Sequence, residues 1–152
     1  MLEEYLKGIS KTAQKGDATE PSYYPTLKDL LEAFAKTSGH GKAQVTAQPK
    51  KTEAGNPDFR VWDGKQHIIG YIEAKPPTQE NLEVIETSEQ LKRYLRTFPN
   101  LILTNFFQFR LYRDGELRDT AQIARPFTVY KRSSVPGLRY CYLPNSALPT
   151  DR

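Results

Sequence analysis

The chain is 152 residues long and 38% hydrophobic, enough for one domain with its own core, and its single cysteine, Cys141, excludes a disulfide framework or a cysteine metal cage. No stretch approaches the ~20 apolar residues of a membrane-spanning helix, and the N-terminus lacks the order of a signal peptide, so we expect a cytoplasmic protein without a membrane partner. The net charge of +4 comes from residues 123–152, which hold five basic residues and one acidic residue, whereas residues 1–122 hold 17 of each.

Two amphipathic helices are predicted in the first forty residues. The first has apolar residues at helical spacing, namely Leu2, Tyr5, Leu6 and Ile9. The second is expected to begin near Pro25, because proline suits the first helical turn, and to end at "SGHG". Its expected buried residues are Leu27, Leu30, Leu31 and Phe34.

Strands dominate the rest of the body. Residues 42–48 alternate like a strand, and residues 59–62 and 66–75 are predicted to form a hairpin around Asp63-Gly64. Residues 83–98 are predicted to be helical, and residues 101–104 are apolar on both faces, as in a central parallel strand. The inward residues of that helix are expected to be Val84, Leu91, Leu95 and Phe98. A last hairpin turns at Asp114-Gly115.

These elements predict an α/β sandwich, in which helices flank a mixed central sheet. Strand 66–75, helix 83–98 and strand 101–104 form a crossover unit, which places the two strands parallel. Residues 1–122 are expected to form the domain. Residues 123–152 contain four prolines and no clean period, so an extended basic tail or linker is expected there.

Three charged residues stand where the sheet should be buried. Asp58 leads directly into strand 59–62, and Glu73 and Lys75 share one face of strand 66–75 with Ile69 and Tyr71. Both faces of this strand begin apolar, which indicates burial on both sides. An unpaired buried carboxylate is costly, so Glu73 needs a cation, a metal or an exit to solvent. The hairpin would bring Asp58 beside Glu73 and Lys75 if a bend or bulge aligns the two strand ends.

Such a set suits phosphodiester hydrolysis. Carboxylate oxygens suit Mg²⁺, which keeps several waters and binds few protein ligands. The metal would polarise the phosphate and lower the pKa of a bound water, and a neighbouring lysine could orient that water and offset charge in the transition state. The alternative is that the strand ends at Pro76-Pro77 and the charges simply meet water.

The residues Pro57-Asp58 and Glu73-Ala74-Lys75 resemble the signature of PD-(D/E)xK nucleases, whose core is a restriction-endonuclease-like sandwich. Gln90 and Tyr94 match the Q-x-x-x-Y element of the RecB-like and Mrr-like branches. The resemblance implies that Asp58, Glu73 and the carbonyl of Ala74 bind Mg²⁺, for which Mn²⁺ would substitute. It further implies that Lys75 positions the water, and that Gln90 and Tyr94 orient the lysine or a phosphate.

A closer resemblance covers residues 1 to about 122. The stretches "GDATEPSYYPTLKDLLEAF" and "RYLRTFPNLILTNFFQFRLYRDGEL" are similar to the N-terminal nuclease domain of fused type IIG and type ISP restriction–modification enzymes. On that pattern Glu20 is an acidic residue that supports the metal site, although it could merely favour the positive end of a helix dipole. Gln90 and Tyr94 could likewise be a polar stripe and a core residue. Tyr23 and Tyr24 are expected in the core.

The resemblance implies a Mg²⁺-dependent DNA endonuclease that acts as the cleavage domain of a restriction system. Its partners would be double-stranded DNA and methyltransferase, specificity or motor domains, either on a longer original chain or on a separate subunit. The zero net charge of residues 1–122 agrees with the need for partner domains. These residues cannot by themselves supply the affinity that a tight DNA binder gains from counterion release. Two alternatives stay open: a non-catalytic nuclease fold used for DNA binding or docking, and a repair or RNA-directed nuclease.

Overall fold

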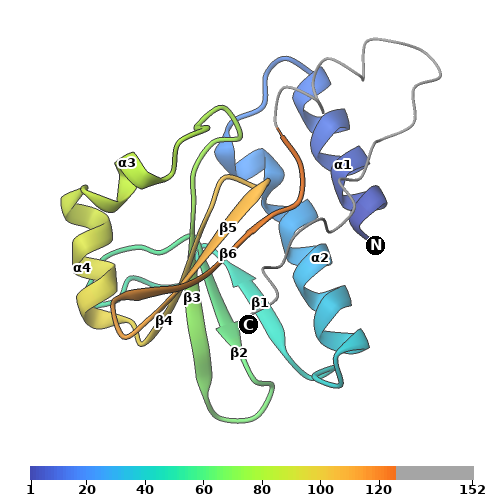
Figure 1. Ribbon diagram of the computed structural model, residues 1–152. Coiled ribbons are helices and arrows are strands. Elements are labelled where there is room, and N and C mark those ends of the chain that lie inside the picture. Colours follow the sequence, from blue (N-terminus) through green and yellow to red (C-terminus); the bar gives the residue numbers. More distant parts are fainter. Residues whose placement is uncertain (126–152) are drawn as a thin grey trace, which may run out of the picture.

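A helical N-terminal part precedes a six-stranded sheet (Figure 1). The computed structural model describes residues 1–125. The helical segments before the sheet are α1 (Leu2–Gln14), the short 3₁₀ helix η1 (Glu20–Tyr23) and α2 (Tyr24–Thr37). The strands are β1 (Gln44–Ala47), β2 (Phe59–Trp62), β3 (Ile68–Ala74), β4 (Asn100–Thr104), β5 (Gln108–Arg113) and β6 (Glu116–Gln122). Helices α3 (Glu83–Glu86) and α4 (Glu89–Thr97) connect β3 to β4.

The strands lie in chain order across the sheet, from β1 to β6. Strands β3 and β4 are parallel, and every other neighbouring pair is antiparallel. The register places Glu73 opposite Leu103 and Ala74 opposite Thr104, so β4 pairs with the end of β3, whereas the pairing with β2 stops at Ile72. The mixed sheet and the crossover between parallel strands are therefore confirmed.

Helices cover both faces of the sheet (Figure 1). Helices α1 and α2 pack on one face through a core that includes Ile9, Leu27 and Phe59. Helix α4 packs on the other face, through a second core that includes Leu91 and Leu103. The predicted α/β sandwich is thus correct, and the end of β3 lies between its two cores.

The predicted helix 83–98 is two helices. Ser88 interrupts it because its side chain accepts a hydrogen bond from the backbone N–H of Leu91 and so caps a new helix, α4. The prediction that Val84 points inward is wrong: it is 59% exposed, and Leu82, just before the predicted helix, is buried instead. Leu91 and Phe98 are buried as expected.

Two other burial predictions are wrong because neighbouring elements leave the last part of α2 and the first part of β3 partly uncovered. Phe34, in the last part of α2, is 58% exposed at an apolar groove that α2 and the sheet line together. Ile68 and Ile69 are about half exposed, at the hairpin end of β3, where the strand projects beyond both cores. Only the far end of β3 is buried as predicted.

Backbone hydrogen bonding continues one residue past the end of β6, because the Ile123 N–H donates to the carbonyl of Phe107. Most of the tail predicted for residues 123–152 lies outside the described residues. None of the helices within residues 1–125 has the length and apolar character needed to cross a membrane.

Candidate active site

Asp58 is placed by the antiparallel pairing of β2 with β3. Phe59 faces Ile72 in this register, so Asp58, one residue earlier, lies beside the end of β3. Its Oδ2 accepts a hydrogen bond from the backbone N–H of Ala74 at 2.8 Å. The hairpin register, which includes an irregularity between Val61 and Trp62, aligns the start of β2 with the end of β3. Asp58 therefore lies beside the strand end that carries Glu73 and Lys75, in a hairpin that contains an irregularity of the kind expected from the sequence.

Glu73 and Lys75 form an ion pair at the end of β3, with 2.7 Å between Lys75 Nζ and Glu73 Oε1. The glutamate is buried, at 3% exposure, whereas the lysine side chain keeps a fifth of its surface in solvent. The Lys75 N–H donates to the carbonyl of Thr104, which fixes the backbone at this point. The second oxygen of Glu73, Oε2, is buried and has no hydrogen-bond partner among residues 1–125. Such orphaned buried acceptors are rare in folded proteins.

The electrostatics of Glu73 reflect this burial. Its pKa is raised to about 7, chiefly because burial disfavours the charged form and secondarily because Asp58 lies close by. The ammonium of Lys75 opposes both effects without cancelling them. The ionised form of Glu73 is therefore only partly compensated by Lys75, and the nearby Asp58 favours its protonated form.

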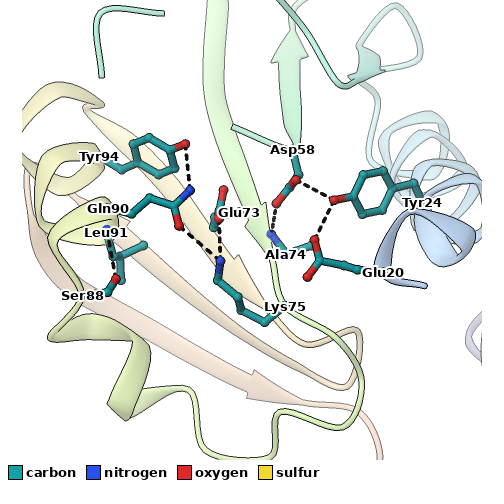
Figure 2. A network of polar contacts seen from close by, with 10 residues as sticks. All are labelled: Glu20, Tyr24, Asp58, Glu73, Ala74, Lys75, Ser88, Gln90, Leu91 and Tyr94. Carbon is teal, nitrogen blue, oxygen red and sulfur yellow. Dashed lines mark hydrogen bonds and ion pairs between the residues drawn. The ribbon is translucent and has the colours of Figure 1, made fainter. Parts of the chain in front are cut away.

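On the α4 side, Gln90 and Tyr94 continue the polar contacts (Figure 2). Lys75 Nζ lies 3.4 Å from Gln90 Oε1, and Gln90 Nε2 lies 3.3 Å from the hydroxyl of Tyr94. Tyr94 is fully buried, and its ring also packs on Phe98. Tyr94 is thus both a core residue and the far end of the polar contacts that reach Lys75.

On the α2 side, Glu20 reaches Asp58 through Tyr24 (Figure 2). The Tyr24 hydroxyl lies 2.8 Å from Glu20 Oε1 and 2.5 Å from Asp58 Oδ1. Burial, followed by the hydrogen bond to Asp58, raises the pKa of Tyr24 far above its ordinary range, so it remains a donor. Burial also raises the pKa of Glu20, with the hydrogen bond from Tyr24 opposing it.

All the residues singled out in the sequence lie in these contacts. They are Glu20, Asp58, Glu73, Ala74, Lys75, Gln90 and Tyr94. Ala74 takes part through its N–H, and the metal-binding role expected of its carbonyl stays a prediction. The sequence interpretation treated Tyr24 as core, which its 5% exposure confirms, but missed its hydroxyl. The sequence contained a signal for this contact, because Glu20 and Tyr24 have the same four-residue spacing as Gln90 and Tyr94.

The donor set fits a hard divalent cation with few protein ligands. Within residues 1–125 there is no cluster of three or more His, Cys, Asp and Glu side chains that would form a complete cage. The two carboxyl groups, Asp58 and Glu73 with its orphaned, buried Oε2, match the partial coordination typical of Mg²⁺, which retains several waters.

No protein-family model matches the chain, and no curated protein matches it. Among solved structures, the cryo-EM structure of a DrdV–DNA complex is similar, with a TM-score of 0.61 and 24% sequence identity. The similarity covers 78% of this chain and 12% of the matched chain. At this identity the likeness concerns the fold alone. The chain therefore shares its α/β fold with a small part of a much longer protein whose structure contains DNA.

Proposed function

We propose that this chain is a Mg²⁺-dependent DNA endonuclease domain of the PD-(D/E)xK type, working as the cleavage part of a restriction system. The observation that carries the proposal is the buried, orphaned Oε2 of Glu73 beside Asp58, with Lys75 on the same strand end. A carboxylate oxygen left unpaired inside a protein costs free energy, and a bound cation would remove that cost. The likeness to a chain solved with DNA supports the choice of substrate.

Asp58 and Glu73 would hold the ion, with the carbonyl of Ala74 as a third protein ligand. When bound there, Mg²⁺ would supply Lewis-acid activation of the phosphodiester and of the attacking water. Lys75, whose ammonium keeps partial access to solvent, would orient that water and offset charge on the pentavalent transition state. Gln90 lies within 3.4 Å of the ammonium and would hold the lysine toward the scissile phosphate.

The DNA partner and the further domains belong to the same proposal. The chain corresponds to 12% of the matched chain, so other protein parts would supply recognition and translocation or methylation. Residues 1–122 carry no net charge, which agrees with a cutting module that relies on such parts to hold double-stranded DNA.

The test is cleavage of supercoiled duplex DNA by the wild type and by Lys75→Ala, with Mg²⁺ or Mn²⁺ in excess. We expect the wild type to nick the DNA in a metal-dependent manner, and Lys75→Ala to lose this activity while it still binds the metal. Lys92→Ala is the matched control, because Lys92 lies nearby on α4 but pairs with the exposed Glu89. Equal cleavage by Lys75→Ala and the wild type would remove the lysine from the mechanism. A wild type that binds metal but never cleaves would favour a non-catalytic DNA-binding or docking module.

A further inference from the structure

The side chain of Tyr24 joins the two carboxyl groups on the α2 side of the candidate site. Its oxygen lies 2.5 Å from Asp58 Oδ1 and 2.8 Å from Glu20 Oε1 (Figure 2). A tyrosine hydroxyl carries one hydrogen, so it donates to one acceptor at a time. The shorter contact is the one to Asp58, and hydrogen bonds to carboxylates at such distances are among the stronger ones in proteins.

Asp58 is held at two points, one on each oxygen. The backbone N–H of Ala74 occupies Oδ2 at 2.8 Å, and the Tyr24 hydroxyl occupies Oδ1. Two donors on opposite oxygens fix both the position and the rotation of a carboxyl group. Each oxygen retains a second lone pair, which is free for another contact.

The tyrosine ring is itself fixed by the core. It is 5% exposed and packs on Phe59 with ring centroids 4.7 Å apart, and on Phe106 at 6.5 Å. Phe59 follows Asp58 directly in the chain, so the same contact that holds the tyrosine also holds the start of β2. The hydroxyl is therefore presented to Asp58 from a rigid frame.

From this arrangement we propose that Tyr24 is a positioning residue for Asp58, a role that rests on the proposed metal site. It acts by orienting the Asp58 carboxyl group toward Glu73, so that a divalent cation meets both groups in one geometry. Glu20 contacts Tyr24 from the other side, so its support of the site passes through the tyrosine hydroxyl. Partners of this kind, one step removed from a metal, change metal affinity or activity by about 10–100-fold when they are removed.

Tyr24→Phe tests the proposal in the full chain, because it removes the hydroxyl and keeps the packed ring. Tyr23→Phe is the matched control: Tyr23 is the adjacent tyrosine, is also buried, and packs on Phe106. We expect the Mn²⁺ dissociation constant, measured by calorimetry, to rise about 10–100-fold in Tyr24→Phe and to stay unchanged in Tyr23→Phe. Cleavage at saturating Mn²⁺ should fall in the first variant alone.

A second measurement separates this proposal from the proposed function. The carboxyl ¹³C resonance of Asp58, assigned by its loss in Asp58→Asn, reports the hydrogen bonds of that group without metal or DNA. It should shift or broaden in Tyr24→Phe and stay in place in Tyr23→Phe. An unchanged Asp58 resonance, or an unchanged Mn²⁺ affinity, in Tyr24→Phe would overturn the positioning role. A wild type that binds no Mn²⁺ would instead overturn the metal site, while the resonance would still decide whether Tyr24 orients Asp58.

Discussion

At the scale of single residues, the ionised form of Glu73 carries an energetic cost in the folded protein. It is 3% exposed, one of its oxygens has no hydrogen-bond partner within the described part of the chain, and its pKa is raised to about 7 by burial and by Asp58. Residues selected only for stability seldom combine these features, because an apolar side chain would pack there without penalty. A perturbed carboxyl group of this kind is more typical of a functional site.

Glu73→Gln should therefore make the metal-free protein more stable at neutral and higher pH. The folded state binds the Glu73 proton more tightly than the unfolded chain, so the free energy of unfolding falls as the pH rises from the ordinary pKa of 4.5 to about 7. Glutamine has no proton to lose in this pH range, so this fall in the free energy of unfolding is absent from the variant. We expect a gain of about 1–3 kcal/mol near pH 8 that shrinks toward pH 5.

Urea unfolding in the presence of a chelator measures this difference. Glu80→Gln, at an exposed position, serves as the control and should leave the pH dependence of stability unchanged. If Glu73→Gln were no more stable relative to the wild type at the higher pH than at the lower, burial of the Glu73 charge would not be a cost to the fold.

At the scale of elements, a buried turn holds the strand end that carries Lys75. Residues 105–107 connect β4 to β5, and Phe106 adopts a φ of 72°, an uncommon value for a bulky residue. The Tyr5 hydroxyl donates to the Phe106 carbonyl at 2.8 Å, and the Phe106 N–H donates to Thr104 Oγ1 at 2.9 Å. The carbonyl of Thr104 in turn accepts the Lys75 N–H, so the turn supports the site.

Asn105→Ala should weaken this turn. Asn105 is 2% exposed; its Oδ1 accepts the N–H groups of Phe107 and Gln108, and its Nδ2 donates to the carbonyl of Gln79. Alanine removes these three hydrogen bonds, one with the buried N–H of Phe107 and two with backbone groups of half-buried residues, and we expect a loss of about 2–3 kcal/mol in the free energy of unfolding.

Chemical denaturation measures the effect of Asn105→Ala, with Asn81→Ala as the control. Asn81 is exposed, and its side chain accepts a hydrogen bond from the N–H of Glu83. Equal losses of unfolding free energy in the two variants would show that burial of the Asn105 hydrogen bonds adds nothing to stability.

The sequence predicted most elements because their signals are local. Proline at the start of α2, Asp-Gly turns and apolar periodicity each act within a few residues, and the hairpin register then aligns Asp58 with Glu73. Exposure of Phe34 and Val84 could not be predicted in this way, because it depends on how each helix packs against elements distant in the sequence. The role of the Tyr24 hydroxyl depends on a contact with Asp58, 34 residues away, that only the packing of α2 against β2 creates.

At the scale of the whole molecule, charge distribution limits DNA affinity. Residues 1–122 balance at zero charge, and the basic surplus, including Lys131, Arg132 and Arg139, lies largely outside the described residues. We expect the full chain to bind short duplex DNA with a dissociation constant no tighter than about 10⁻⁶ M at physiological salt. Gel-shift titration measures this, and nanomolar binding specific to one sequence would contradict the idea that other domains hold the DNA.

The most direct test of the metal site is a calorimetric titration of the chain with Mn²⁺, wild type against Glu73→Gln. The glutamine keeps the shape of the side chain and removes the charge, so the fold should persist while metal binding is lost. We predict one saturable binding event in the wild type, no detectable heat in Glu73→Gln, and an unchanged event in the exposed control Glu80→Gln. Equal Mn²⁺ affinity in the wild type and in Glu73→Gln would show that Glu73 is not a ligand, and the proposed nuclease site would be wrong.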